Sequence, residues 1–479
     1  MGRGFHRGRH CRPTRTGTEQ TVTELKRDLG IWAAVSIVVG TVIGSGIFRV
    51  PQAMTQNAGS IRMVFGVWIV GGILTMAGAL TYAELASMLP GAGGEYVYLT
   101  EAYGPMWGFL YGWTQMWVAK SGSIATLATA FFEYSGNFWP ELEHVFFRIP
   151  LPLGEHGAPL NVSYGQIFAI AVILVLALVN YFGVKVGGDL QVTVTAVKVG
   201  LIAFIILAGI LHGNTAESHA PVALPTTAGF FAALVAALWA YDGWNNVGMV
   251  ASEVKNPQRN LPRALIGGSL AVMVIYLLAN IAYFLVLSPA TVAGHKLVAA
   301  EMMRRIQGQA GANWVSLAAM ISIFAALNGS ILTGARVPYA MARDGIFFRS
   351  VAHVHPRFRT PGVSILALSA WSAILVLSGR YDQLFTYVIF ASWILYAMAA
   401  ASVIVLRRKR PDLPRPYRTL GYPIVPVLFV ATAFLLEVFT LKQSPRESIA
   451  GIVLILLGLP CYYYWKRRSP QPSGDLPAA

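Results

Sequence analysis

The chain has 479 residues, of which 55% are hydrophobic and only 12% are charged. Soluble domains are about one-quarter charged, and a surface with so few charges would expose large apolar areas to water. The composition therefore excludes a soluble protein and predicts an integral membrane protein. The net charge is +15, and the two cysteines, Cys11 and Cys461, are too few for a disulfide framework.

Long apolar stretches recur along the whole chain. A hydrocarbon core about 30 Å thick is spanned by about 20 residues of helix. Twelve stretches have this character, and only those around Lys198 and Asp242 contain a charge: Gly30–Phe48, Met63–Ala83, Tyr103–Ala119, Gly165–Phe182, Leu190–Leu211, Gly229–Ser252, Ala264–Gly294, Trp314–Ala335, Val363–Gly379, Gln383–Leu406, Leu420–Leu436 and Ser448–Trp465. We expect an all-α integral membrane protein with twelve transmembrane helices.

The cationic residues indicate the orientation. With the N-terminus inside, the segments between helices place 24 Lys and Arg on the inner side and nine on the outer side. Cytoplasmic loops carry such an excess, so we expect a multi-pass protein of the plasma membrane with both termini in the cytoplasm. The positive charge is spread over six short segments, which favours contact with anionic lipid over nucleic-acid binding.

The first and sixth apolar segments contain features that an uninterrupted span would avoid. Gly44-Ser45-Gly46 lies inside the first, and Asp242-Gly243 lies inside the sixth. Glycine lowers helix stability by about 1 kcal/mol relative to alanine, and a charge at mid-membrane costs at least about 2.5 kcal/mol. Both features predict broken helices, although the spacing of Gly40 and Gly44 is also typical of close helix packing.

Five segments begin at each predicted break, which indicates two five-helix repeats of opposite orientation with the binding site between them. The last two segments lie outside this scheme as accessory helices. The expected divisions are an N-terminal cytoplasmic tail (1–29), the first repeat (30–212), the inverted repeat (213–406), the accessory helices (407–468) and a C-terminal cytoplasmic tail (469–479).

Four motifs resemble those of amino-acid transporters of the amino acid–polyamine–organocation superfamily, in particular its L-type amino-acid transporter branch. They are VGTVIGSGIF at 39–48, TYAELASMLPGAGGEYVYL at 81–99, WAYDGWNNVGMVASEVKNPQRNLPRA at 239–264 and ARVPYAMARDG at 335–345. With the twelve-helix plan, the resemblance covers nearly the whole chain.

The resemblance implies a substrate site at the two breaks. The α-carboxylate of an amino acid is expected at the N–H groups of Ser45 and Gly46, and the α-ammonium at the carbonyls of Val42, Trp239 and Asp242. Freed amides at a half-helix N-terminus form an anion site, and carbonyls at helix C-termini suit a cation. The full expected set is Val42, Ile43, Gly44, Ser45, Gly46, Trp239, Asp242, Gly243 and Asn245, with Trp239 also covering the substrate as an aromatic gate.

Two ionisable residues inside the membrane have alternative interpretations. Asp242 either biases the pocket toward cationic or polar side chains or caps a helix that begins at Gly243. The resemblance places Lys198 where sodium-coupled relatives hold Na⁺ between helices 1 and 8, which predicts Na⁺-independent transport. A buried lysine can also release its proton near neutral pH, so proton coupling remains an alternative.

The other membrane charges are expected away from the substrate. We expect Glu84 and Arg336 to stabilise a closed inner gate. The charges after the sixth segment, such as Glu253, either form a solvated loop or pair with Arg343-Asp344. Lys120, in the third segment, has no role that the resemblance assigns.

The resulting functional prediction is a secondary transporter that moves L-amino acids by Na⁺-independent exchange or facilitated transport. The alternative is a proton-coupled amino-acid or polyamine symporter. The chain contains none of the sequence motifs of a metalloprotease, a P-loop ATPase or a serine hydrolase, so we expect neither an enzyme nor a cofactor or metal site. In animal members of the branch that the chain resembles, a cysteine in the outer loop between helices 3 and 4 is bonded to a glycoprotein heavy chain. The corresponding segment here, Ser135–Ser163, contains no cysteine, so no disulfide-linked heavy chain is expected.

Overall fold

The computed structural model describes residues 24–150, 160–213, 220–224, 226–377, 381–443 and 445–468. Most of the N-terminal tail with Cys11, and the whole C-terminal tail, lie outside these residues. Within them, eight helices are long and apolar enough to cross a membrane, and two shorter apolar helices cover Thr227–Ala240 and Gly362–Leu377. The protein is a multi-pass helical membrane protein.

Each of the twelve expected segments lies on a helix or on consecutive helices. In the first half these are α1 (Ile31–Val42), α2 (Gly46–Ala58), α3 (Ile61–Met88), α4 (Glu95–Tyr103), α5 (Pro105–Thr114), a π-helix (Gln115–Ala119), α6 (Lys120–Ser135), α7 (Tyr164–Tyr181) and α8 (Val184–His212). Between α6 and α7, a 3₁₀ turn (Pro140–Glu143) leads to an antiparallel hairpin of β1 (Val145–Ile149) and β2 (Leu160–Ser163).

The second half continues in the same way. It contains α9 (Thr227–Ala240), α10 (Asn246–Met249), a 3₁₀ turn (Ala251–Glu253), α11 (Pro257–Val286), α12 (Pro289–Gly294), α13 (Val298–Gly334), α14 (Arg336–Arg343), a 3₁₀ turn (Arg349–Ala352), α15 (Gly362–Leu377), α16 (Tyr381–Lys409), α17 (Ile424–Gln443), α18 (Pro445–Leu456) and α19 (Gly458–Arg468). The seventh expected segment is shorter than predicted, because α11 ends at Val286 and Ser288 then caps α12.

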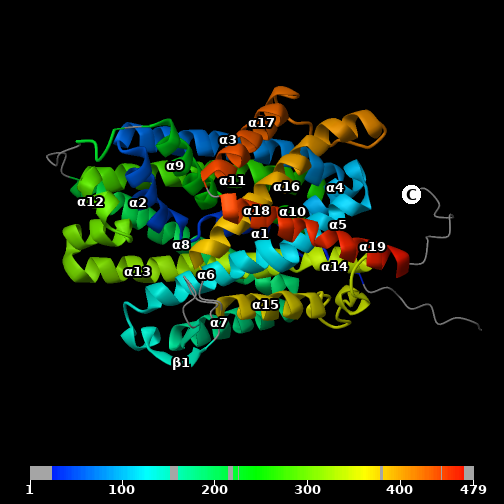
Figure 1. Cartoon of the computed structure of the whole chain (residues 1–479), viewed down its shortest axis with the longest axis horizontal. Helices are drawn as coiled ribbons and strands as arrows, with labels where there is room; N and C mark the ends of the chain where they lie inside the picture. The colour runs from blue at the N-terminus through cyan, green and yellow to red at the C-terminus, as the bar shows by residue number, and fades with distance from the viewer. Residues whose placement is uncertain are drawn as a thin grey trace, which may run out of the picture.

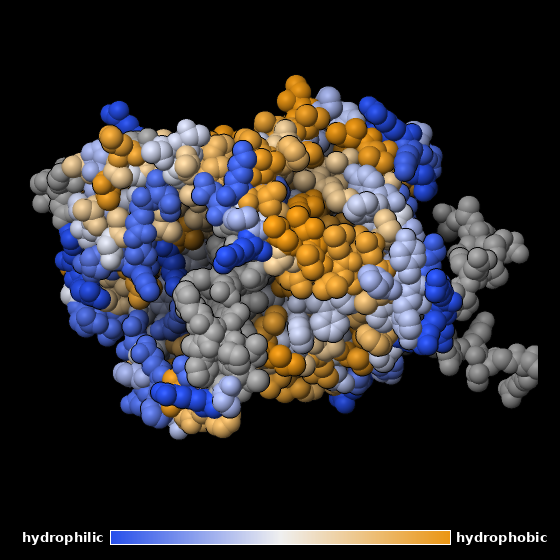
Figure 2. Space-filling view, viewed as in Figure 1, coloured by the Kyte–Doolittle hydropathy of each residue, from blue (hydrophilic) through white to orange (hydrophobic). Residues whose placement is uncertain are grey.

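The long helices run broadly along the longest dimension of the molecule, with α12 toward one end and α4, α14 and α19 toward the other (Figure 1). Apolar side chains cover the sides of the bundle, for example Leu174 and Leu178 on α7 and Phe204 and Leu207 on α8. Figure 2 shows broad hydrophobic patches on one side and hydrophilic residues gathered at the end where α14 and α19 lie. This surface suits a lipid bilayer and would be unstable in water.

The two predicted breaks are present. Residues 43–45 leave the helix between α1 and α2, and residues 241–245 form turns between α9 and α10. Gly243 has a φ of 102°, a conformation that residues with a Cβ rarely adopt. A third interruption, the π-helix before α6, was not predicted, because it contains no proline or glycine to indicate it.

Candidate functional site

The two breaks lie against each other in the interior. The Oγ1 atom of Thr41, at the end of α1, lies 2.9 Å from the carbonyl oxygen of Gly243 in the second break. At Gly46, the first residue of α2, an added Cβ would lie 2.9 Å from the Cα of Ala240 at the end of α9. Only glycine allows this approach, so Gly46 brings the N-terminus of α2 next to the C-terminus of α9.

A small cavity lies between the breaks. Seven of the nine predicted substrate residues line it: Val42, Gly44, Ser45, Gly46, Trp239, Asp242 and Gly243. The remaining lining residues are Thr41, Ser123, Leu127, Ala240, Asn246 and Ser330. The sequence does not identify these remaining lining residues, because they belong to helical segments whose rotation decides which side chains face the cavity.

The cavity has one end suited to an anion and one suited to a cation. Helix α2 begins at Gly46, and the first N–H groups of a helix have no partner within it. At the opposite polarity, α1 ends at Val42 and α9 ends at Ala240, where helices present free carbonyls. An α-amino acid carries both charges on one carbon, so this arrangement can bind both of its ionic groups.

Tyr276 on α11 joins the two carbonyl-bearing helix ends. Its hydroxyl oxygen lies 2.8 Å from the carbonyl oxygen of Ala240 and 3.0 Å from that of Val42. A carbonyl oxygen has two lone pairs, so the Ala240 carbonyl retains capacity for an ammonium group, whereas the Val42 carbonyl also accepts a hydrogen bond from the Gly44 N–H at 2.8 Å. The sequence analysis missed Tyr276, because nothing in the local pattern of α11 distinguishes it from the other membrane aromatics.

Two predicted substrate residues point away from the cavity. The Ile43 carbonyl accepts a hydrogen bond from Lys198, and the Ser322 hydroxyl donates to the same oxygen at 2.9 Å. The Asn245 amide donates to the carboxylate of Glu95, which is fully buried on α4. Ile43 and Asn245 therefore contact the surroundings of the cavity and do not form part of its lining.

Lys198 lies between α1 and α13. Its Nζ donates to the carbonyl of Gly40 at 2.7 Å and to that of Ile43, and it lies 3.4 Å from the carbonyl of Ser322. The ammonium is fully buried. It therefore connects the carbonyls of the first break to the eighth membrane segment.

Asp242 lines the cavity from the second break. One carboxylate oxygen lies 3.2 Å from the hydroxyl of Tyr396 on α16. The helix after the break begins at Asn246, with Asn245 at its N-cap position, so Asp242 does not cap it. Asp242 therefore faces the cavity and does not cap the following helix, and its effect on substrate preference stays a prediction.

Comparison with known proteins agrees with this architecture. The family model described as "Amino acid permease" matches residues 29–458. The serine/threonine exchanger SteT of Bacillus subtilis is 35% identical over 93% of this chain and 98% of its own. The chain belongs to the amino acid permease family.

Two human transporters are also similar to this permease. The b(0,+)-type amino acid transporter 1 is 31% identical over 96% of this chain and 92% of its own length. The cystine/glutamate transporter is 29% identical over 93% of this chain and 86% of its own. These relatives are transporters and not enzymes.

The permease has a buried ion pair where α14 begins. Arg336, the first residue of α14, contacts both carboxylate oxygens of Glu253 at 2.6 and 2.9 Å, and both side chains are fully buried. The prediction of a solvated loop at Glu253 was therefore wrong. The predicted pairing of Glu253 with Arg343-Asp344 was also wrong, because Arg336 occupies both of its carboxylate oxygens. The Asp344 carboxylate accepts a hydrogen bond from the Tyr96 hydroxyl at 2.6 Å.

The chain segment before α1 is tied to the same place. The Leu29 N–H donates to the Glu253 carbonyl at 3.0 Å, and the Lys255 N–H donates to the Leu29 carbonyl at 2.8 Å. These two bonds form a short parallel bridge between Leu29 and Val254. The segment that follows the second break is thus held by a side-chain pair and by the backbone.

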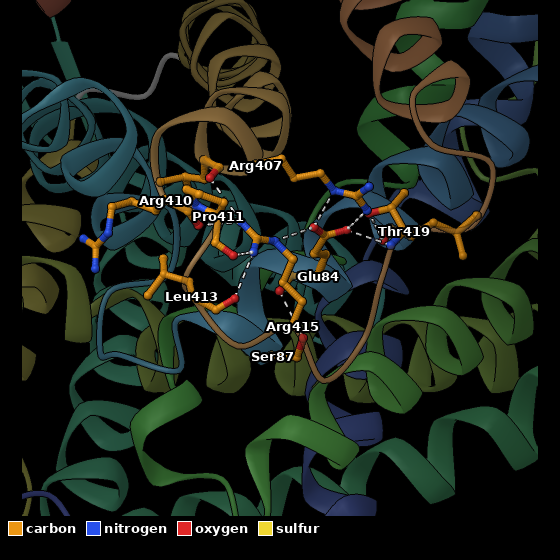
Figure 3. Close-up of polar contacts among 10 residues, drawn as sticks. Glu84, Ser87, Arg407, Arg410, Pro411, Leu413, Arg415 and Thr419 are labelled. Carbon is orange, nitrogen blue, oxygen red and sulfur yellow. Dashed lines mark hydrogen bonds and ion pairs between the residues drawn. The ribbon is translucent and has the colours of Figure 1, made fainter.

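Glu84 forms a second cluster, shown in Figure 3. Arg407 donates to both of its carboxylate oxygens at 2.9 and 2.7 Å, and the Thr419 N–H donates at 2.7 Å. The Arg415 guanidinium lies 3.6 Å from the same carboxylate. Glu84 therefore ties the end of α3 to the connection between α16 and α17, and neither Glu84 nor Arg336 lines the cavity.

Proposed function

We propose that this permease exchanges L-amino acids across the plasma membrane by alternating access to the cavity between the two helix breaks. The observation that carries the proposal is the meeting of the α2 N-terminus with the C-terminal ends of α1 and α9 around one cavity. The N–H groups of Ser45 and Gly46 would bind the α-carboxylate, and the carbonyls of Val42 and Trp239 the α-ammonium.

The proposed cycle has two gates, one on each side of the bound amino acid. Trp239, which lines the cavity, would close over the bound amino acid on its outer side. The Arg336–Glu253 pair would close the inner side and separate when the pathway opens to the cytoplasm. This assignment rests on the positive-inside distribution, with both termini in the cytoplasm, and on the two inverted five-helix repeats at 30–212 and 213–406.

The proposed transport does not require Na⁺. Lys198 supplies a fixed positive charge between α1 and α13, where it satisfies the carbonyls of Gly40 and Ile43. A cation bound there in addition would meet electrostatic repulsion from the ammonium. The outer segment Ser135–Ser163 has no cysteine, so the permease would work without a disulfide-linked heavy chain.

Counterflow in proteoliposomes tests this proposal. Vesicles that contain the purified permease and 10-fold gradients of unlabelled amino acids would be exposed to radiolabelled serine, with NaCl or choline chloride outside. We expect uptake only into vesicles preloaded with an amino acid, at equal rates in the two salts. Uptake into empty vesicles driven by a pH gradient would favour the proton-coupled symporter, and a large loss of rate in choline would contradict the role of Lys198.

A further inference from the structure

Lys120 lies directly behind the cavity. It is the first residue of α6 and follows the π-helix Gln115–Ala119. Such π-helical insertions change the direction of the side chains that follow and are frequent at functional sites. The Lys120 side chain is 6% exposed, and its Nζ donates to Oδ1 of Asn246 at 2.7 Å.

Asn246 connects this lysine to the cavity. Asn246 lines the cavity together with Asp242 and Gly243 of the same break, and its N–H donates to the Gly243 carbonyl at 3.2 Å. Among the described residues, Asn246 Oδ1 is the only hydrogen-bond acceptor of the Lys120 ammonium. An ammonium has three N–H donors, and only one of them is used by Asn246. The other interactions of Lys120 with the second break are electrostatic.

The carboxylate of Asp242 is stabilised by a nearby positive charge. Asp242 is the only ionisable side chain among the described residues that line the cavity. A carboxylate in a low-dielectric interior strongly attracts a positive charge. The Lys120 ammonium interacts electrostatically with Asp242 and also with Glu95, which accepts hydrogen bonds from Tyr111 and Asn245.

We propose that Lys120 is a specificity-determining residue that makes the cavity select amino acids with neutral side chains over those with cationic ones. This inference rests on the proposed amino-acid exchange. Lys120 offsets the charge of Asp242, the ionisable side chain that lines the cavity among the described residues, and so weakens its attraction for a second ammonium or a guanidinium. A lysine or arginine substrate would bring its side-chain cation close to the Lys120 ammonium.

Lys198 does not have this effect. Its ammonium is held by the carbonyls of Gly40 and Ile43 on the other side of the first break. It lies between α1 and α13, and no interaction joins it to Asp242 among the described residues. The two lysines therefore provide a matched pair for experiments, with the same residue type buried on opposite sides of one cavity.

The test compares Lys120→Met, Lys120→Arg and the double variant Lys120→Met with Asp242→Asn in proteoliposomes. Methionine keeps the apolar stem, which packs against Gly334 so closely that a Cβ there would lie 2.4 Å from Lys120 Cγ. Serine counterflow would be inhibited with arginine, lysine, alanine and threonine at graded concentrations. The measured quantity is the ratio of the inhibition constants for cationic and neutral amino acids.

We expect this ratio to shift at least about tenfold toward the cationic amino acids in Lys120→Met, a difference of about 1.4 kcal/mol in binding. Lys120→Arg should keep the wild-type ratio, and the double variant should return to it. An unchanged ratio in Lys120→Met, or equal preference for cationic and neutral amino acids in the wild type, would overturn the inference. Wild-type vesicles without any amino-acid counterflow would instead contradict the proposed function.

If Lys120→Met is not monodisperse after purification, Lys120→Gln replaces it in the same comparison. Binding is then measured as the rise in thermal unfolding temperature of the detergent-solubilised protein with arginine or serine. A larger rise with arginine in Lys120→Gln than in the wild type supports the inference. Equal rises in the two proteins overturn it.

Discussion

The two lysines buried on either side of the cavity are held in different ways. Lys198 binds the backbone carbonyls of Gly40 and Ile43. Lys120 binds one side-chain amide, that of Asn246, and interacts electrostatically with the carboxylates of Asp242 and Glu95. A cation held by carbonyls fixes the backbone around it, whereas a cation opposite carboxylates sets the charge of the site. Lys198 therefore stabilises the backbone of the first break, whereas Lys120 determines which substrates are preferred.

A third buried cation, Arg336, provides the reference for this comparison, because its carboxylate partner Glu253 is in direct contact. Arg336→Met should lower the free energy of unfolding by about 3–5 kcal/mol, since it leaves a buried carboxylate without its partner. Adding Glu253→Gln should recover most of the loss. Thermal and denaturant unfolding of the purified protein in detergent measures both, and a double variant no more stable than the single one would refute the pairing argument.

Lys198→Met should lower exchange of all amino acids by about 10- to 100-fold without changing the preference among them. The substitution removes the lysine donor from the Gly40 carbonyl and leaves the Ile43 carbonyl with only the Ser322 hydroxyl, and an unsatisfied buried group costs about 1–3 kcal/mol. Counterflow rates with alanine, serine, lysine and arginine measure the effect. If Lys198→Met changed the preference for cationic substrates as much as Lys120→Met, the distinction between the two lysines would be lost.

Asp242→Asn should change selectivity in the direction opposite to Lys120→Met. Without the carboxylate, the Lys120 ammonium is no longer offset, so inhibition of serine counterflow by glutamate and aspartate should strengthen by about 3- to 10-fold, a change of about 1 kcal/mol. Inhibition by alanine should change by less than about twofold and serves as the control. Unchanged inhibition by acidic amino acids would show that Lys120 does not act on the cavity.

Glu95, the second carboxylate that faces Lys120, predicts a smaller effect of pH. Burial in the protein raises the pKa of the Glu95 carboxyl from its ordinary value of 4.5 to about 7. The folded protein then keeps a proton that the unfolded chain has released, so stability falls as the pH rises between about 4.5 and 7. The unfolding temperature should therefore be about 2–4 °C higher at pH 5.5 than at pH 7.5.

Glu95→Gln should remove most of this difference, because glutamine does not titrate. Glu101→Gln, on the exposed face of the same helix α4, is the matched control and should keep the wild-type pH dependence. The measurement is thermal unfolding in detergent at several pH values. If the unfolding temperature of Glu95→Gln changed with pH as much as that of the wild type, Glu95 would not be the group that causes the pH dependence.

The parts of the site that the sequence predicted are those with a local signature. Gly44-Ser45-Gly46 and Asp242-Gly243 are unfavourable inside a membrane helix, so their positions could be identified from the chain alone. Ser123 and Ser330 could not, because each lies within a helix and faces the cavity only through the packing of that helix. Tyr276 also lies within a helix, and only that packing brings its hydroxyl to the carbonyls at the breaks.

Contacts between polar side chains that are distant in the sequence could not be predicted either. Arg336 and Glu253 are 83 residues apart, and Lys120 and Asn246 are 126 apart. Nothing near Glu253 in the sequence distinguishes a buried partner of an arginine from a solvated loop charge. The turn of the π-helix that directs Lys120 toward Asn246 has no sequence marker either, so its place behind the cavity required the structure.

Under the proposed cycle, the bridge between Leu29 and Val254 would report the conformation of the permease. If the inner end opens, the strand-like hydrogen bonds of Leu29 with Glu253 and Lys255 must separate together with the Arg336–Glu253 pair. Amide protection at Leu29 and Lys255 would then follow the fraction of time that the inner pathway is closed. Hydrogen exchange at these two backbone positions would read the conformational equilibrium without a label on any residue of the transport pathway.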